Sequence, residues 1–373
     1  MIVHLIIIFL ALFLVCYSRN KKLGLKWACS FVALFLSIRY YWGNDYTNYV
    51  SFYQEFNQLD FGLFDIERSS TAFRNQEWGW VILNRVYGAT GLGFFGLIIT
   101  LSIFECWVMY RTIVKFLEPK YYWIAVVFWL FTDTFCINAS MIRQYLCICL
   151  YLLVVDLMIH KKGRFYLVWS IAIILIGSTI HRAILMAFVS LPFYYIHVKH
   201  GRKTIVFSIA VGLLFVVWSL TGRQLLEPYL LLFLEGNDDF SYYMNYVGQE
   251  SSGVGTGIGL VFQYMTLTAW LFLLPYLKRE QQVFAMLIIF SYFFEVVGDI
   301  APIFQRLALF FSAVSIITWS YFITYGKRWE VLYVLFGIEI IMLIRIFYGF
   351  YHSALWGPHY YHYHTIFEAN GWM

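Results

Sequence analysis

Long apolar segments recur along the whole chain and restrict it to folds that lipid can surround. Each segment is about 17–22 residues long, enough for an α-helix to cross the roughly 30 Å hydrocarbon core of a bilayer. A closed β-barrel would instead give shorter segments of alternating polarity. Only 13% of the residues are charged and 61% are hydrophobic, whereas a soluble domain carries about 25% charged residues. The sequence therefore predicts an all-α, polytopic membrane bundle.

We expect about twelve transmembrane helices within a single domain, residues 1–373. The first segment has no basic residues before it and no small-residue cleavage site after it, so we interpret it as a membrane span and not as a signal peptide. The expected spans are 2–18, 25–38, 91–110, 121–138, 143–159, 165–180, 183–197, 204–221, 257–276, 282–298, 303–324 and 331–350.

Basic residues cluster after every odd-numbered span, and this alternation predicts the orientation of the chain. By the positive-inside rule, the clusters face the cytoplasm. Both termini and the two longest connections, 39–90 and 222–256, then lie on the non-cytoplasmic side. The clusters run from Arg19 to Lys26, Arg111 to Lys120, Lys161 to Arg164, Lys199 to Lys203, Lys278 to Arg279 and Lys327 to Arg328.

The basic residues on the expected outer side are all arginines. A guanidinium binds phosphate in a bidentate manner and stays charged at low dielectric, whereas a lysine ammonium is a strongly hydrated point charge. This bias favours an oxyanion ligand. The alternative is that some of these arginines extend to the interface or pair with acidic neighbours. They are Arg39, Arg68, Arg74, Arg85, Arg143, Arg182, Arg223, Arg306 and Arg345.

The two long outer connections are expected to contain structure of their own. Segments 45–59 and 77–90 have apolar residues at helical spacing, which predicts amphipathic helices lying on the membrane interface. In the second connection, the apolar stretch 226–234 is too short to span a membrane, so we interpret it as a re-entrant or interfacial piece.

The first outer connection offers candidate carboxylates and sugar-binding aromatic residues. Asp45 follows the second span closely, with Tyr46 and Tyr49 after it, and Glu77 and Trp78 precede the third span. A carboxylate could deprotonate a sugar hydroxyl, and aromatic rings could stack on sugars. The structural alternative is that Asp45 and Glu77 stabilise helix N-termini while the rings belong to the interfacial belt.

Three further pairs place polar groups at outer span ends: Arg143-Gln144, His181-Arg182 and Gln305-Arg306. Ionisable groups near spans are costly and usually face the interior of a bundle. Arg143, Arg182 and Arg306, with Arg39, are candidate diphosphate ligands, and Gln144 and Gln305 are candidate substrate contacts. A neutral His181 beside cations would suit a general base, although it could also be a turn residue bonded to backbone.

Several common functions have no motif in this chain. It contains no Walker A loop, no His-Glu-x-x-His helix and no Gly-x-Ser-x-Gly elbow, which argues against an ATPase, a zinc protease and a serine hydrolase. We predict no cofactor, no metal and no nucleic-acid partner. The Asp238-Asp239 pair could still bind a divalent cation. The histidine-rich tail 352–368 is interpreted as an aromatic interfacial tail.

Taken in order along nearly the whole chain, these elements resemble the EpsG-like exopolysaccharide polymerases, which belong with the Wzy-type O-antigen polymerases. The likeness is carried by Arg39 with Gly43-x-Asp45-Tyr46-x-x-Tyr49, Glu77-x-Gly79, Arg143-Gln144, His181 and Arg306.

The resemblance implies a GT-C-like membrane glycosyltransferase in the bacterial plasma membrane, working on its outer face. It would transfer a glycan from polyprenyl diphosphate to a second carrier-linked repeat unit, with membrane lipid around it and a chain-length regulator as a candidate partner. The arginines would bind the diphosphate, and His181, Asp45 or Glu77 would act as base in an inverting, metal-independent displacement.

Two other classes of protein stay open at this stage. A transporter or flippase of lipid-linked glycans would carry charges at several depths, for which Glu105, Asp133, Asp156, Glu295 and Glu339 are the candidates. A membrane acyltransferase modifying glycans would need an inner or buried histidine, for which His160, His197 and His200 are the candidates.

Overall fold

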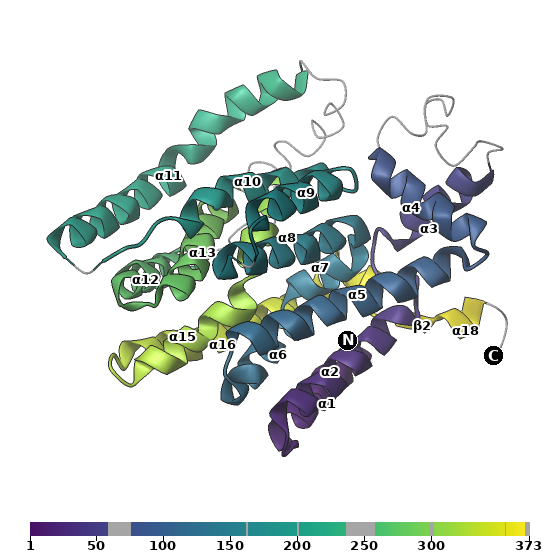
Figure 1. The fold of residues 1–373 in the computed structure, drawn as a ribbon, viewed down its shortest axis with the longest axis horizontal. Helices are drawn as coiled ribbons and strands as arrows, with labels where there is room; N and C mark the ends of the chain where they lie inside the picture. The colour runs from purple at the N-terminus through teal and green to yellow at the C-terminus, as the bar shows by residue number, and fades with distance from the viewer. Residues whose placement is uncertain are drawn as a thin grey trace.

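The chain folds into helices that run broadly along one direction (Figure 1). This computed structural model describes residues 1–58, 76–161, 163–199, 201–235, 258–297, 302–354 and 356–369. Apart from two short strands, the regular structure of these residues is helical, which confirms the all-α prediction. The acidic residues that lie outside the described ranges include Asp238 and Asp239 of the second outer connection, and Asp60, Asp65 and Glu67 of the first.

The long helices coincide with most of the expected spans. Three of them are long and apolar enough to cross a membrane, or four if a bent pair is counted as one span, among the residues described. The chain is therefore a multi-pass helical membrane protein, and the count of twelve stays a prediction. The long helices are α1 Ile2–Tyr17, α2 Lys21–Ser37, α5 Gly93–Phe116, α8 Ile142–His160, α9 Tyr166–Ser178, α11 Arg202–Glu235, α12 Ile258–Leu273, α13 Arg279–Val297 and α16 Val331–His352.

Three expected spans are interrupted. The span at 121–138 is divided into α6 Tyr122–Leu130 and α7 Asp133–Ser140, with Thr132 at the N-cap position of α7. The span at 183–197 consists of short pieces, η3 Arg182–Met186, α10 Ala187–Ser190 and η4 Leu191–Tyr194. Pro192 lies at the start of η4, where a missing backbone N–H is tolerated. The span at 303–324 is divided into α14 Pro302–Ser312 and α15 Ser315–Gly326, bent by 54°.

Helix α8 lies at the centre of the bundle and α16 at its edge. In the most apolar 18-residue window of α8, 72% of the residues are buried, against 28% for α16. The exposed face of α16 therefore suits contact with lipid. Because α8 is held on all sides, the residues at its outer end, which begins with Ile142 and Arg143, have fixed positions.

The two amphipathic helices of the first outer connection are present as α3 Tyr46–Gln58 and α4 Trp78–Ala89. We expected these helices to lie on the membrane interface, and that position stays a prediction. They pack on each other and on the start of α5, forming a second apolar cluster. The physical reason is that their large side chains match one another, with Tyr46 and Trp80 both at 0% exposure.

Helix α11 changes the interpretation of the second outer connection. It continues without a break to Glu235, so the stretch 226–234 is the end of a long helix and not a separate re-entrant piece. The connection expected at 222–256 is helical as far as residue 235, and its remainder lies outside the described residues. Pro228 is accommodated within the helix.

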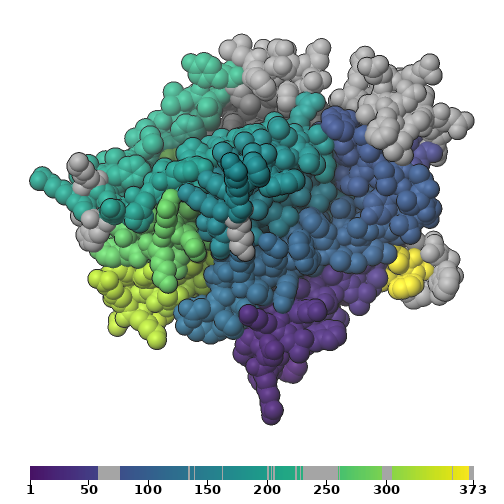
Figure 2. Space-filling model, viewed as in Figure 1, coloured from purple at the N-terminus to yellow at the C-terminus, as the bar shows by residue number. Residues whose placement is uncertain are grey.

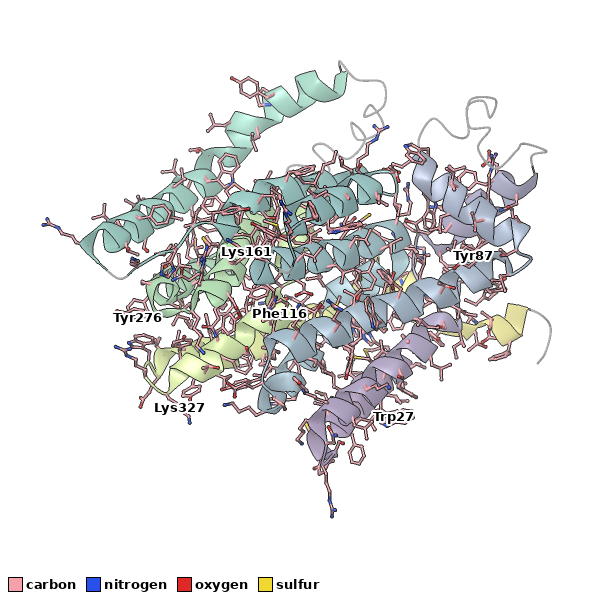
Figure 3. The ribbon with its side chains drawn as sticks, in the orientation of Figure 1. Trp27, Tyr87, Phe116, Lys161, Tyr276 and Lys327 are labelled. Carbon is pink, nitrogen blue, oxygen red and sulfur yellow. The ribbon has the colours of Figure 1, made fainter. Side chains whose placement is uncertain are left out.

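The turns that carry basic residues meet at one end of the molecule. The Tyr325 hydroxyl donates to Gln281 Oε1 (3.1 Å), and the Arg279 guanidinium donates to the carbonyl of Tyr194 (3.5 Å). Figure 3 shows Tyr276 and Lys327 at the end opposite to Tyr87 of α4. This separation matches the alternation of loops expected from the sequence.

The two ends of the chain approach each other at the end that carries α3 and α4. The amino group of Met1 donates to the carbonyl of Tyr361 (3.5 Å). Strand β2 His364–Thr365 pairs antiparallel with β1 Arg39–Tyr40, in the register Arg39 to Thr365. Figure 2 shows the C-terminal segment lying against the N-terminal region of the chain. Met1 and the described part of the C-terminal segment therefore lie on the same side as α3 and α4.

Candidate active site

Glu77 connects three segments that are far apart in the sequence. Its Oε2 accepts a hydrogen bond from Arg143 NH1 of α8 (2.6 Å), and its Oε1 lies 3.3 Å from His181 Nδ1. The same Oε1 accepts the backbone N–H of Arg182 (3.2 Å). The side chains of Glu77, Arg143 and His181 are 13%, 18% and 16% exposed. All three side chains are thus largely shielded from solvent but keep part of their surface exposed.

Gly79 explains why Glu77 reaches the turn that holds His181. The Gly79 N–H donates to the carbonyl of Thr179 (2.8 Å), just before His181. A Cβ at position 79 would lie 2.1 Å from Thr179 Oγ1 and 2.7 Å from its carbonyl oxygen. Only glycine permits this close approach of backbones, and the approach places the N-terminus of α4 against the end of α9.

The electrostatics of this cluster separate the carboxylate from the imidazole. Burial raises the pKa of Glu77, but the bond to His181, the charge of Arg143 and the Arg182 N–H outweigh it and lower the pKa to about 2. Burial lowers the pKa of His181, against the opposing effect of Glu77. At neutral pH, Glu77 is therefore ionised and His181 is uncharged.

The protonation state of the pair determines the tautomer of His181. An ionised carboxylate can only accept hydrogen bonds, so Nδ1 must carry the proton that faces Glu77. The other ring nitrogen, Nε2, is then an unprotonated acceptor. A carboxylate orients a histidine for general-base chemistry in the same way in catalytic triads.

The Arg143 side chain packs against aromatic residues of the first outer connection. Its guanidinium lies over the ring of Tyr49, 5.9 Å from the centroid, and Tyr49 packs edge-on against Trp80. Tyr49 is only 6% exposed. We predicted a sugar contact for Tyr49; in the structure its ring packs against Arg143 and Trp80, which leaves little of it exposed.

Gln144 brings the outer end of α8 against α14. Its Nε2 donates to the carbonyl of Arg306 (2.9 Å), while its Oε1 is buried and has no hydrogen-bond partner among the described residues. Arg306 is half-buried, and its charge acts on both His181 and Asp45. Two of the three expected guanidiniums are therefore close to the same histidine.

Asp45 faces this cluster from the first outer connection. The pKa of its carboxyl is raised, because the effect of burial outweighs the opposing charges of Arg306, Arg143 and His359. Its backbone N–H donates to Ser140 Oγ (3.0 Å), at the end of the helix that leads into α8. Asp45 therefore lies among the arginines and on a different element from Glu77.

The remaining polar candidates lie on the rim. Arg182 contributes its backbone N–H to Glu77, and its side chain is exposed. Gln305 is exposed beside Arg306, and Trp78 is 53% exposed beside Glu77. These three side chains are accessible from the outer end without forming part of the buried pairing.

Arg39 and Tyr46 have structural positions instead of substrate-facing ones. Arg39 is 2% exposed, and its NH1 donates to the carbonyl of Leu36 (2.8 Å) and to Ser102 Oγ (3.4 Å). The Tyr46 hydroxyl donates to the Arg39 carbonyl (3.1 Å). The predicted diphosphate contact of Arg39 and sugar contact of Tyr46 stay predictions, and in this structure both side chains are buried and donate to groups of the protein.

Comparison with known protein families identifies the family of this chain. A model described as the EpsG family matches residues 25–365. The chain belongs to the EpsG family. This is a Wzy-like family of polysaccharide polymerases, so the protein is a membrane polysaccharide polymerase. No curated protein and no solved structure matches the chain.

Other polar groups that were considered for alternative functions have partners away from this site. Asp156 pairs with Arg111 (2.9 Å) and with Lys115 at the basic end of α5. His160 lies 3.0 Å from Asp156, and the His197 ring bonds Gln282 Oε1 (3.0 Å). Membership of the EpsG family and these local pairings together favour the polymerase over the acyltransferase interpretation.

Sequence reasoning missed two residues of the candidate site. Ser140 is fully buried and bonds both the Asp45 N–H and Asn44 Oδ1. His359, in the C-terminal tail, accepts the Gly43 N–H with its carbonyl (3.1 Å), two residues before Asp45. A lone serine carries no pattern that would indicate this role. The tail histidines did stand out, but we assigned them to the membrane interface.

Proposed function

We propose that the protein polymerises polyprenyl-diphosphate-linked oligosaccharide repeat units on the outer face of the bacterial plasma membrane. The observation that carries the proposal is the Glu77–His181–Arg143 cluster, which places an oriented neutral base beside guanidinium groups in an EpsG-family chain. Both termini would then lie outside the cell, on the same side as the site. With His181 uncharged, the three arginines Arg143, Arg182 and Arg306 outnumber the two carboxylates Glu77 and Asp45, which leaves one positive charge for a diphosphate.

In the proposed reaction, His181 Nε2 takes the proton of the acceptor hydroxyl. The hydroxyl oxygen attacks the anomeric carbon of the donor glycan, the bond from that carbon to the phosphate oxygen breaks, and polyprenyl diphosphate leaves. This single displacement inverts the anomeric configuration. Diphosphate is a good leaving group, so general-acid assistance is not needed, and guanidiniums stabilise the growing charge.

The structure supports different roles for the three candidate bases. Glu77 has a pKa near 2, so it is a poor proton acceptor at neutral pH, and we assign it to orienting His181 and Arg143. We assign Asp45 to the acceptor side, facing Arg306. Arg143 and Arg306 would bind the diphosphate, Arg182 and Gln305 would extend the binding surface at the rim, and Gln144 would fix Arg306. Trp78 offers an exposed ring for a sugar.

The proposal is tested by replacing Arg143 with Lys in purified protein reconstituted with a carrier-linked repeat unit. Lysine keeps the charge but not the bidentate geometry, so we expect polymer formation to fall by about 100-fold or more. The readout is the ladder of products on a gel. Arg345→Lys is the matched control, because Arg345 is an exposed outer-side arginine on α16. A normal ladder from Arg143→Lys would refute the diphosphate clamp.

A further inference from the structure

The C-terminal segment Ser353–Ala369 returns to the loop that carries Asp45. Strand β2 pairs with β1, and the Ile366 N–H donates to the carbonyl of Ile38 (2.9 Å) just before it. Figure 1 shows β2 and the short helix α18 Ile366–Ala369 beside the end of the first two helices. The segment thus closes over the start of the first outer connection.

Two hydrogen bonds link this segment to the turn immediately before Asp45. The Gly43 N–H donates to the carbonyl of His359 (3.1 Å), and Trp42 Nε1 donates to the carbonyl of Tyr360 (3.3 Å). The Trp42 and Tyr360 rings pack edge-on, at 1% and 0% exposure. The turn is therefore fixed by the segment through both its backbone and its largest side chain.

The opposite side of the turn is fixed by α7. Ser140 Oγ accepts the Asp45 N–H and donates to Asn44 Oδ1 (2.9 Å). Gly43 has φ of 113°, and a Cβ there would lie 2.7 Å from the Ser140 side chain. The Tyr360 hydroxyl donates to the carbonyl of Cys136 in the same helix (2.9 Å). The turn is enclosed between α7 and the C-terminal segment.

Undocking this segment would carry a large cost. It would expose the Trp42 and Tyr360 rings, each of which buries roughly 150–250 Å² in a protein core. It would also break the β1–β2 pairing and the two bonds to the turn. A segment held in this way suits a permanent wall and not a lid that opens in each catalytic cycle.

We propose that the segment Gly357–Ala369 is a permanent wall of the active site that positions Asp45, and that the exposed side chain of His359, beside the Asp45 turn, contacts the bound acceptor. The inference rests on the proposed polymerase function, in which Asp45 lies on the acceptor side. Arg306 of α14 and Arg143 of α8 face the Asp45 carboxylate from the other elements. His359 is exposed, so its side chain can reach a bound acceptor without unfolding the segment.

The docking is tested by a cysteine pair, Tyr40→Cys with His364→Cys. These positions are partners in the β1–β2 register, and the Cα spacing of antiparallel partners suits a disulfide. Cys16, an exposed native cysteine, is replaced by Ser in the same protein. We expect the disulfide to form in the membrane-embedded protein and polymerisation to stay within about twofold of the reduced form.

Two results would overturn the permanent wall. Failure of the disulfide to form would mean that the segment is not docked. Loss of polymer on oxidation with recovery on reduction would mean that the segment must move during turnover. Because the cross-link is measured on the protein itself, this arm stays informative even if Arg143→Lys refutes the polymerase mechanism.

The His359 contact is tested by three single variants assayed at saturating donor and acceptor. We expect His359→Ala to lower the polymerisation rate by about tenfold, whereas His359→Gln, which keeps a hydrogen-bonding side chain, should retain most of it. His362→Ala is the matched control, since His362 is an exposed histidine of the same segment, and it should leave the rate unchanged. Equal rates for His359→Ala and His362→Ala would show that His359 is not part of the site.

Discussion

At the scale of single residues, Glu77 uses its two carboxylate oxygens for different neighbours. One oxygen holds a guanidinium, and the other faces an imidazole and a backbone N–H. Removing one partner of a shielded ion pair leaves the other charge uncompensated, which costs several kcal/mol when burial is complete. The residue therefore contributes to stability as well as to the arrangement of the site.

Glu77 gives the protein an acid-dependent stability that can be measured. Its pKa falls from 4.5 to about 2 in the folded state. A lowered carboxylate pKa stabilises the fold above the unfolded value, and this contribution is lost as pH falls from about 4.5 to 2. We expect it to reach about 3 kcal/mol. Thermal unfolding of the wild type and of Glu77→Gln should converge across that window, and a constant difference would contradict the assignment.

His181 should determine the acid limb of the pH–rate profile. Its pKa is lowered from the ordinary value of 6.5, mainly by burial, so the uncharged base persists below that pH and activity is lost only at more acidic values. The measurement is kcat/KM for polymerisation between pH 5 and 8, with His362→Ala as a control that keeps the profile. Activity that falls with a midpoint above 6.5 would contradict a buried His181 base.

At the scale of elements, the site depends on backbones that approach closely where helices end. The N-terminus of α4 touches the end of α9 through Gly79 and Thr179, and the turn before α3 touches the end of α7 through Gly43 and Ser140. Both contacts lie outside the apolar stripes that hold the helices together. They adjust the position of polar side chains and add little buried apolar area.

Replacing Gly79 with Ala should displace Glu77 without unfolding α4. The added methyl would meet Thr179 at 2.1 Å and 2.7 Å, and overpacking of this kind costs about 1–3 kcal/mol. We expect polymerisation to fall by at least about tenfold, measured together with the thermal unfolding temperature. Thr179→Ala in the same protein should restore activity only in part, because the carbonyl contact remains.

Gly337→Ala is the control for this prediction. Gly337 lies within α16, and a Cβ there would have no neighbour within 4 Å. Alanine is favoured over glycine inside a helix by about 1 kcal/mol, so this variant should be as stable as the wild type or more so, with unchanged activity. Full activity from Gly79→Ala would show that the α4–α9 contact does not position Glu77.

At the scale of the whole molecule, polar chemistry is divided between the two ends of the bundle. One end carries the basic turns and the Asp156 ion pairs, and the other carries Glu77, His181, Met1 and Tyr361. The exposed apolar side chains of α11 and α16 lie between these ends, where lipid would cover them. This division is what a protein with chemistry on one membrane face requires.

The orientation of the two ends should be visible by chemical labelling of single cysteines. In a protein with Cys16→Ser, we expect Tyr361→Cys to react with a membrane-impermeant maleimide in intact spheroplasts. Lys327→Cys should react only after permeabilisation. Both native side chains are exposed, so accessibility within the protein does not limit either reaction. The opposite pattern would place the site on the cytoplasmic face.

The sequence by itself determined the membrane class, most of the helices and the candidate site residues at the outer end. Apolar run length and charge placement carry that information because each span must satisfy its own backbone in lipid. Glu77, Arg143 and His181 could each be selected from the scarcity of polar groups near spans, but their pairing could not, since it joins residues 66 and 104 positions apart.

Only the tertiary structure decided which polar groups face the site and which are consumed by the fold. Arg39, Tyr46 and Tyr49 share the composition of substrate-binding residues, yet packing of α3, α4 and α5 uses their rings and donors internally. The breaks in the spans at 121–138 and 303–324 and the return of the tail to Asp45 also depend on long-range contacts. Hydrophobic patterning records which residues avoid water, and it does not record which neighbours they meet.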